Sequence, residues 1–254
     1  MKVHYLFIPV LTVFLSCGER KSEDTFEVTP VLPLRTVADI PAPEGYIIDQ
    51  FPENSFSRFI QSLPLKDGPV ISDYTGKRVI NPIYRVMAVV DLPLLFNSDL
   101  EQCADFSMRI WADFHLKTGR MDSLYLFNYD GKKQYFNKEH DTYRTFLKRA
   151  FSVSNSHSLK MGCRKIEPAR LKPGDLIVQN DDGGIGHVSM IMNSARRSTG
   201  EVLYLVGFSF MPAQEFHIEN AMKYGTSGWF GAEGYVTFLK NHLDLGVPVF
   251  RRFE

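Results

Sequence analysis

Two residues of this chain have the types and the sequence surroundings that cysteine catalysis requires. Cys103 stands in a helix-like stretch, NSDLEQCADFSMRIWADFH, and His187 begins a strand-like stretch, HVSMIMN. A nucleophilic thiol needs an imidazole to take its proton, and a rigid element must hold that imidazole. A strand leaves the base little freedom, and Gly186 before it permits close approach. The pattern predicts attack on a carbonyl carbon, with Cys103 as the nucleophile and His187 as the general base.

Each of these residues also has a purely structural interpretation. Cysteine is among the most buried residue types, so Cys103 on an apolar helix face is consistent with core packing. Cys163 offers a disulfide partner in an oxidising compartment, provided that the two Cα atoms lie within about 7 Å. The catalytic interpretation instead predicts that Sγ of Cys103 lies within hydrogen-bond reach of the His187 ring. The residues alone leave an enzyme, a non-catalytic binding module and a disulfide-bonded structural protein open.

The helix that carries the cysteine is predicted from its apolar spacing and its start signal. Ser98 and Glu101 form a capping-box pattern, which places the helix start one residue after Ser98. Cys103 then lies beyond the first turn, where the helix dipole has little effect on a thiol. Asp105 and Arg109 lie four residues apart on another face and are expected to form an ion pair.

The elements after this helix read as antiparallel strands that carry the histidine. A helix followed by such strands is typical of the α+β class. If residues 187–193 and 201–208 form a hairpin, the partner of His187 lies between residues 207 and 209. Ser209, Gln214 and His217 are therefore the candidates to orient the imidazole. The stretch MPAQE, residues 211–215, is expected either to edge a cleft or to form a turn before an edge strand.

The start of the chain predicts export and lipidation. Lys2 followed by the apolar run 3–15 is typical of a signal peptide. Ser16-Cys17-Gly18 resembles the bacterial lipobox, which implies lipid on Cys17. We therefore expect residues 1–17 to be a lipoprotein signal peptide, 18–43 a polar tether and 44–254 a single domain. The lipid on Cys17 would attach the protein to a membrane, which is its expected partner. The expected location is the bacterial cell envelope, at the outer membrane or its periplasmic face.

Charge and motif content argue against several other functions. The formal net charge of +0 provides no basic surface for nucleic acid. The sequence has no H-E-x-x-H motif and no paired C-x-x-C, so no metal site is expected. Its one glycine cluster, DDGGIG, lacks the helix and the lysine of a phosphate loop. We therefore expect no cofactor.

The stretch LKPGDLIVQNDDGGIGHVSMIM resembles the histidine-bearing half of papain-like cysteine hydrolases of the NlpC type. The nucleophilic cysteine of those enzymes opens an earlier helix, although they usually have DCSGF where this chain has QCADF. The resemblance implies a papain-like α+β fold and an amidase or peptidase acting on envelope peptide, including peptidoglycan-like material. In such a site the Gln102 side chain and the Cys103 N–H would bind the oxyanion.

A closer resemblance runs over nearly the whole chain after the signal peptide. The stretches DLEQCADFSMRIWADF, SHSLK, FMPAQEFHI and VPVFRRF are similar to a family of bacterial envelope lipoproteins known as domain of unknown function 4846. This implies a shared fold and site without naming a substrate. That family often shows a Gln-Ser pair where this chain has Phe208-Ser209, so an obvious orienting amide is missing. The site is then either a catalytic dyad or an inactive module on the same fold.

Overall fold

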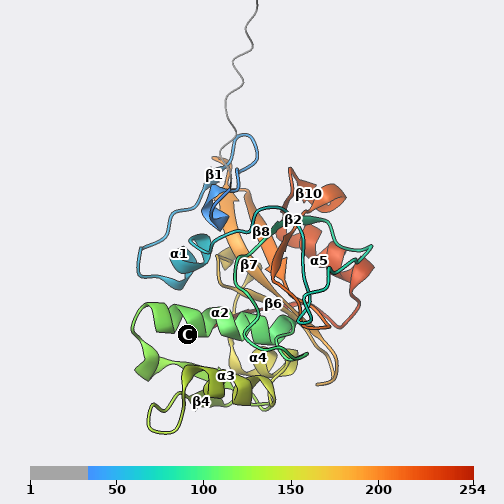
Figure 1. Cartoon of the computed structure of the whole chain (residues 1–254). Coiled ribbons are helices and arrows are strands. Elements are labelled where there is room, and N and C mark those ends of the chain that lie inside the picture. Colours follow the sequence, from blue (N-terminus) through green and yellow to red (C-terminus); the bar gives the residue numbers. More distant parts are fainter. Residues whose placement is uncertain (1–33) are drawn as a thin grey trace, which may run out of the picture. The chain divides into compact units, whose positions relative to one another are not determined.

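An antiparallel sheet organises the part of the chain that the computed structural model describes, residues 34–254 (Figure 1). Its main path runs β10-β11-β8-β7-β6-β12-β5, while β1 pairs with β7 and β9 joins β8 to β2. A separate hairpin pairs β3 with β4. The strands are β1 (Ile47–Ile48), β2 (Val86–Val89), β3 (Tyr125–Phe127), β4 (Lys133–Tyr135), β5 (Arg164–Lys165), β6 (Leu176–Gln179), β7 (His187–Arg196), β8 (Val202–Phe208), β9 (His217–Glu219), β10 (Gly225–Thr226), β11 (Trp229–Phe230) and β12 (Val249–Arg252).

Five α-helices accompany the sheet in this region, which confirms the predicted α+β class. The cysteine-bearing α2 packs against the histidine-bearing β7, and α1 packs against both of them. The C-terminal α5 packs against β11. The helices are α1 (Phe56–Gln61), α2 (Cys103–Lys117), α3 (Tyr143–Phe151), α4 (Ser156–Gly162) and α5 (Ala232–His242).

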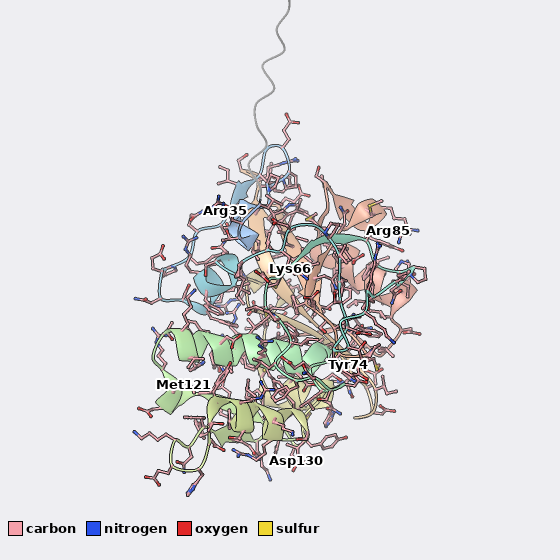
Figure 2. All side chains as sticks on the ribbon, in the orientation of Figure 1. Arg35, Lys66, Tyr74, Arg85, Met121 and Asp130 are labelled. Carbon is pink, nitrogen blue, oxygen red and sulfur yellow. The ribbon has the colours of Figure 1, made fainter. Side chains whose placement is uncertain are left out.

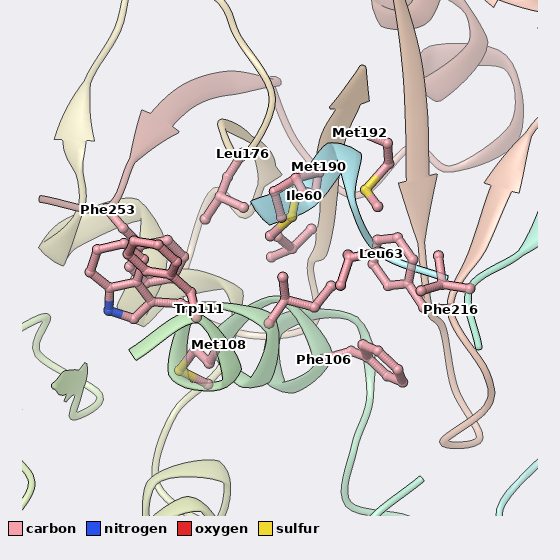
Figure 3. Close-up of a cluster of buried hydrophobic side chains, with 14 of the residues drawn as sticks. Ile60, Leu63, Phe106, Met108, Trp111, Leu176, Met190, Met192, Phe216 and Phe253 are labelled. Carbon is pink, nitrogen blue, oxygen red and sulfur yellow. The ribbon is translucent and has the colours of Figure 1, made fainter. Parts of the chain in front are cut away.

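Alternation along β7 separates two hydrophobic clusters. Val188, Met190 and Met192 belong to the cluster that includes the buried face of α2 (Figure 3). Ile191 belongs to a second cluster, which it shares with residues of α5. Successive side chains of a strand point to opposite faces. His187 and Ser189 therefore point toward the second cluster, and the Ser189 hydroxyl is hydrogen-bonded to the Tyr235 hydroxyl of α5 at 2.6 Å.

Residues close to the start of the described part of the chain pack into the domain, which differs from the prediction of a tether up to residue 43. Val37 and Ile40 are buried in the core, and Trp229 Nε1 donates to the Pro41 carbonyl at 3.0 Å. Arg35, near the start of the described residues, is labelled in Figure 2. The expectation that the tether extends to residue 43 is therefore wrong for residues 34–43, because their apolar side chains pack into the domain. The predicted signal peptide and Cys17 lie outside the described residues.

Within residues 34–254, no helix is both long and apolar enough to cross a membrane.

Candidate active site at the start of helix α2

Helix α2 begins at the cysteine itself, which corrects the predicted start near residue 99. Cys103 is the first helical residue and Gln102 is the N-cap. The Gln102 N–H donates to Asp105 Oδ2 at 3.3 Å, so Asp105 takes the role that the sequence pattern gave to Glu101. Cys103 therefore lies in the first turn, where the unpaired N–H groups and the helix dipole favour negative charge.

Glu101 is unavailable for capping because a buried ion pair uses it. Its Oε2 accepts from the Leu95 and Phe96 N–H groups, and its Oε1 accepts from Arg109 at 2.9 Å. Arg109 also contacts Asp113 at 3.4 Å. The predicted pair between Asp105 and Arg109 is therefore wrong, because the guanidinium is already engaged by two other carboxylates.

Cys103 lines a cleft of about 430 Å³. The cleft is lined by the start of α2, by the loop 183–186 that leads into His187, and by residues 154–156 and Met211. Cys103 is only 9% exposed. Burial raises the pKa of the thiol to about 12, although the backbone N–H groups of Val188, Ala104 and Cys103 act to lower it. The resting thiol is therefore protonated at neutral pH, and these three N–H groups favour its thiolate form.

His187 is fully buried and makes no hydrogen bond. Neither of its ring nitrogens has a partner among the described residues. Its ring meets the Phe208 ring edge-on at 5.0 Å between centroids, and the Phe210 ring at 5.4 Å. Burial lowers the pKa of His187 to about 3, with a smaller effect from His217. The hydrogen bond expected between Cys103 and His187 is not formed here, because the imidazole points toward the second cluster while Val188 faces α2.

The three candidate orienting residues lie near His187 and are bonded elsewhere. The Ser209 hydroxyl donates to the Gln214 carbonyl at 2.7 Å. The Gln214 side-chain amide donates to the Tyr84 hydroxyl at 2.9 Å. His217 Nε2 is paired with Glu219 at 3.2 Å, and Phe208 is the register partner of His217. None of the three is hydrogen-bonded to His187 in this structure.

Gln102, the predicted oxyanion donor, lines the cleft beside Cys103. Its side-chain amide donates to Asp99 Oδ1 at 3.0 Å. Asp99 in turn accepts from the Ala213 N–H at 2.6 Å. Asp99 therefore joins the start of α2 to the stretch MPAQE. Of that stretch, Met211 lines the cleft, in accord with the cleft-edge interpretation.

Gly186 holds the loop before His187 tightly against its neighbours. A Cβ at this position would lie 2.2 Å from the Gln179 carbonyl oxygen and 2.3 Å from the Ser156 hydroxyl oxygen. Asn180 Nδ2 donates to the same Ser156 hydroxyl at 2.8 Å. The absence of a side chain at Gly186 thus fixes where β7 begins and where His187 stands.

The disulfide alternative is wrong in this structure, because Cys103 and Cys163 are both free. Cys163 is the C-cap of α4, and burial raises the pKa of its thiol. Among residues 34–254, no group of three or more His, Cys, Asp or Glu side chains is placed to hold a metal ion.

Tyr84 is a member of the site region that the sequence did not reveal. Its ring lies 4.8 Å from the His217 ring and 5.7 Å from the Phe208 ring. Burial raises the pKa of its hydroxyl to about 12, and the nearby Cys103 adds slightly to that rise. Tyr84 comes just before a predicted buried strand, and no local pattern separates it from an ordinary core tyrosine.

One comparison with known proteins assigns the chain to a family. The profile of domain of unknown function 4846 matches residues 37–138 and 128–243. The chain belongs to this family. Its matched region includes Cys103, the glycine-rich loop and His187, so the cleft lies within the part of the chain that defines this family. No curated protein and no solved structure matches the chain.

Proposed function

We propose that this protein is a papain-like cysteine hydrolase, an amidase or peptidase that acts on peptide material of the bacterial envelope. The observation that carries the proposal is Cys103 as the first residue of α2, lining a cleft together with Gly186, the residue before β7. The N–H groups of the first turn suit a thiolate and the oxyanion formed after attack. The lipobox-like segment around Cys17 supports attachment to the membrane by lipid.

The reaction follows from the chemistry of these groups. His187 takes the thiol proton as Sγ of Cys103 attacks the carbonyl carbon of an amide. The Cys103 N–H and the Gln102 side chain bind the oxyanion. When the intermediate collapses, the C–N bond breaks and His187 protonates the leaving amine. Water then attacks the acyl carbon of the thioester and gives a proton to His187. The C–S bond breaks, the carboxylic acid leaves, and His187 returns the proton to the sulfur of Cys103.

Activation in this site depends on substrate binding. Both Cys103 and His187 are neutral at rest, because burial raises the pKa of the thiol and lowers the pKa of the imidazole. Proton transfer then requires that His187 turn toward the thiol. Catalytic hydrogen bonds are often loose in a free enzyme and tighten only in the substrate complex.

A second candidate function is a non-catalytic binding cleft on the same fold. One observation favours it: Phe208 lies against His187, and neither ring nitrogen of His187 has a partner among the described residues. In that case Cys103 would be retained for packing, and the cleft would hold a ligand without cleaving it.

Acetylation by p-nitrophenyl acetate separates the two functions. We expect a burst of p-nitrophenolate with an acetyl group on Cys103, detected by intact mass. The burst should vanish in Cys103→Ala and slow at least about tenfold in His187→Ala, because general bases contribute about 10²–10⁴ in rate. Cys163→Ala is the matched control and should keep the burst. A wild-type protein that forms no acetyl-cysteine, or forms it equally well without His187, would contradict the hydrolase.

A further inference from the structure

The cleft in front of Cys103 contains a buried carboxyl group that has no cation to pair with. Asp105 is 7% exposed and lines the cleft. Its Oδ2 accepts from the Gln102 N–H, while its Oδ1 has no hydrogen-bond partner among the described residues. The closest basic side chain along the helix, Arg109, binds Glu101 and Asp113 instead. A buried polar atom without a partner costs free energy, so its presence here calls for an explanation.

The other ionisable groups around the cleft have the same sign. Asp99 is the second carboxylate in the lining, and among the lining residues that the structure describes there is no lysine, arginine or histidine. The start of α2 contributes about half a positive charge. The Asp99 carboxylate opposes that contribution, and Asp105 adds a second negative charge when it ionises. The lining therefore offers a ligand cation two acidic partners, and none of its described residues is basic.

We propose that this cleft binds the primary ammonium group of its ligand, and that the Asp105 side chain turns its Oδ1, which is closed to solvent in the empty cleft, toward that group. An ammonium offers three donors and a full positive charge, which matches an unpartnered carboxylate oxygen. The volume of about 430 Å³ lies at the small end of ligand pockets, so the ligand segment is short. The ammonium is either the amino terminus of a short peptide or the side chain of a lysine-like residue.

The state of Asp105 in the empty cleft is consistent with this role. Burial raises its pKa well above the usual range, and Glu101 adds to the rise. The carboxyl is thus neutral while the cleft is empty, which avoids an unpaired buried charge. An arriving ammonium favours the carboxylate, and the proton that Asp105 loses passes to solvent. This inference names the ligand class for the cleft of the proposed hydrolase, and the same ligand class applies if the cleft only binds.

The test measures binding by the full-length chain carrying Cys103→Ala, so that no turnover interferes. Three probes are compared by calorimetry: alanyl-alaninamide, which has a free amino terminus; N-acetyl-alanyl-alaninamide, which has no ammonium; and N-acetyl-lysinamide, which has only the side-chain ammonium. We expect at least one ammonium probe to bind at least about tenfold more tightly than the acetylated dipeptide. Whichever ammonium probe binds more tightly identifies the source of the group.

Two further variants assign the preference to one carboxylate. Asp105→Asn should remove the preference, whereas Asp122→Asn, a matched change of an exposed carboxylate outside the cleft lining, should alter affinity by no more than about twofold. If Asp105→Asn does not fold, the probe comparison on the parent protein still decides. Equal affinity for the three probes, no binding of either ammonium probe at millimolar concentration, or a preference that survives in folded Asp105→Asn would overturn the inference. Because Cys103 is absent, these outcomes are independent of whether the protein is a hydrolase.

Discussion

At the scale of single residues, the phenylalanine beside the candidate base decides what the site can do. Phe208 is fully buried, and its ring meets the His187 ring edge-on. A phenyl ring offers no acceptor that would hold one imidazole tautomer. An orienting group in cysteine hydrolases does so by accepting a hydrogen bond from the base. The candidate site therefore lacks an acceptor for His187 at the position of one side chain, Phe208.

Replacing Phe208 by glutamine should strengthen the site. We expect Phe208→Gln to raise the rate of Cys103 acetylation at least about tenfold, because the amide can orient the imidazole. Phe208→Leu is the matched control, since it loses a similar part of the core without gaining an amide, and it should leave the rate unchanged or lower. Initial rates of acetyl-cysteine formation check this. If the two variants react alike, Phe208 is not what restrains His187.

His187 should also make the stability of the whole protein depend on pH. Its folded pKa is about 3, below the value of about 6.5 in an unfolded chain. Between these values the unfolded state binds the proton, so stability is complete above pH 6.5 and is lost as pH falls.

The effect should appear in denaturant unfolding at several pH values. From pH 6.5 to 4.5 the wild type should lose about 2–3 kcal/mol more free energy of unfolding than His187→Gln, at about 1.4 kcal/mol per pH unit. The comparison of the two chains removes the effect of carboxylates that they share. Parallel pH profiles would mean that His187 is solvated or paired in the folded protein.

At the scale of elements, the loop between β6 and β7 sets the distance between the histidine and the cleft. Gly186→Ala brings a Cβ to 2.2 Å from the Gln179 carbonyl oxygen, so the backbone must move. We expect a loss of about 2 kcal/mol and a decrease in Tm of about 4–8 °C, together with slower acetylation of Cys103. Thermal unfolding followed by circular dichroism measures the first effect.

Gly184→Ala in the same loop is the matched control. The nearest atom to its added Cβ is Asp182 Oδ1 at 3.2 Å, the end of an exposed side chain that can turn away. This variant should keep both the wild-type Tm and the acetylation rate. A similar loss in both variants would show that the loop as a whole, and not the close approach at Gly186, governs the site.

The elements themselves were largely predictable from the sequence, whereas their ends were not. The hairpin predicted at 187–193 and 201–208 is confirmed as β7 and β8, because alternation and turn residues are local signals. The predicted start of α2 was wrong because Ser98 and Glu101 fit a capping-box pattern as well as Gln102 and Asp105 do. The Glu101 carboxylate is instead bonded to Arg109 and to the chain around residue 95, and such distant contacts leave no local pattern.

At the scale of the whole molecule, the fold brings together residues that lie far apart in the sequence. Helix α2 packs on β7, and the first residue of α2 lines the same cleft as Gly186, the residue before β7. The sequence indicated that Cys103 and His187 would be neighbours in this way. It did not indicate that alternation would turn His187 toward the second cluster, because that depends on which face of β7 the helix covers.

The same packing buries two residues near the start of the described part of the chain. Val37 and Ile40 complete the core on the side of α1, and this contact could not be read from a polar, proline-bearing segment. Likewise, the sequence did not show that Asp105 would lack a cation, because Arg109 contacts Glu101 and Asp113 instead. Partner choice within a buried cluster depends on geometry that the spacing of residues does not fix.

The central claim is that Cys103 and His187 act as a pair in the folded protein. The most direct measurement is alkylation by iodoacetamide from pH 6 to 10, followed by peptide mass spectrometry on wild type and His187→Ala, with buried Cys163 as the internal control. The account predicts that Cys103 is alkylated in the folded protein while Cys163 is spared, and that His187→Ala slows the reaction at least about tenfold at pH 7.5. Alkylation of Cys103 only after unfolding, or at the same rate without His187, would contradict the account and leave a cleft that binds without catalysis.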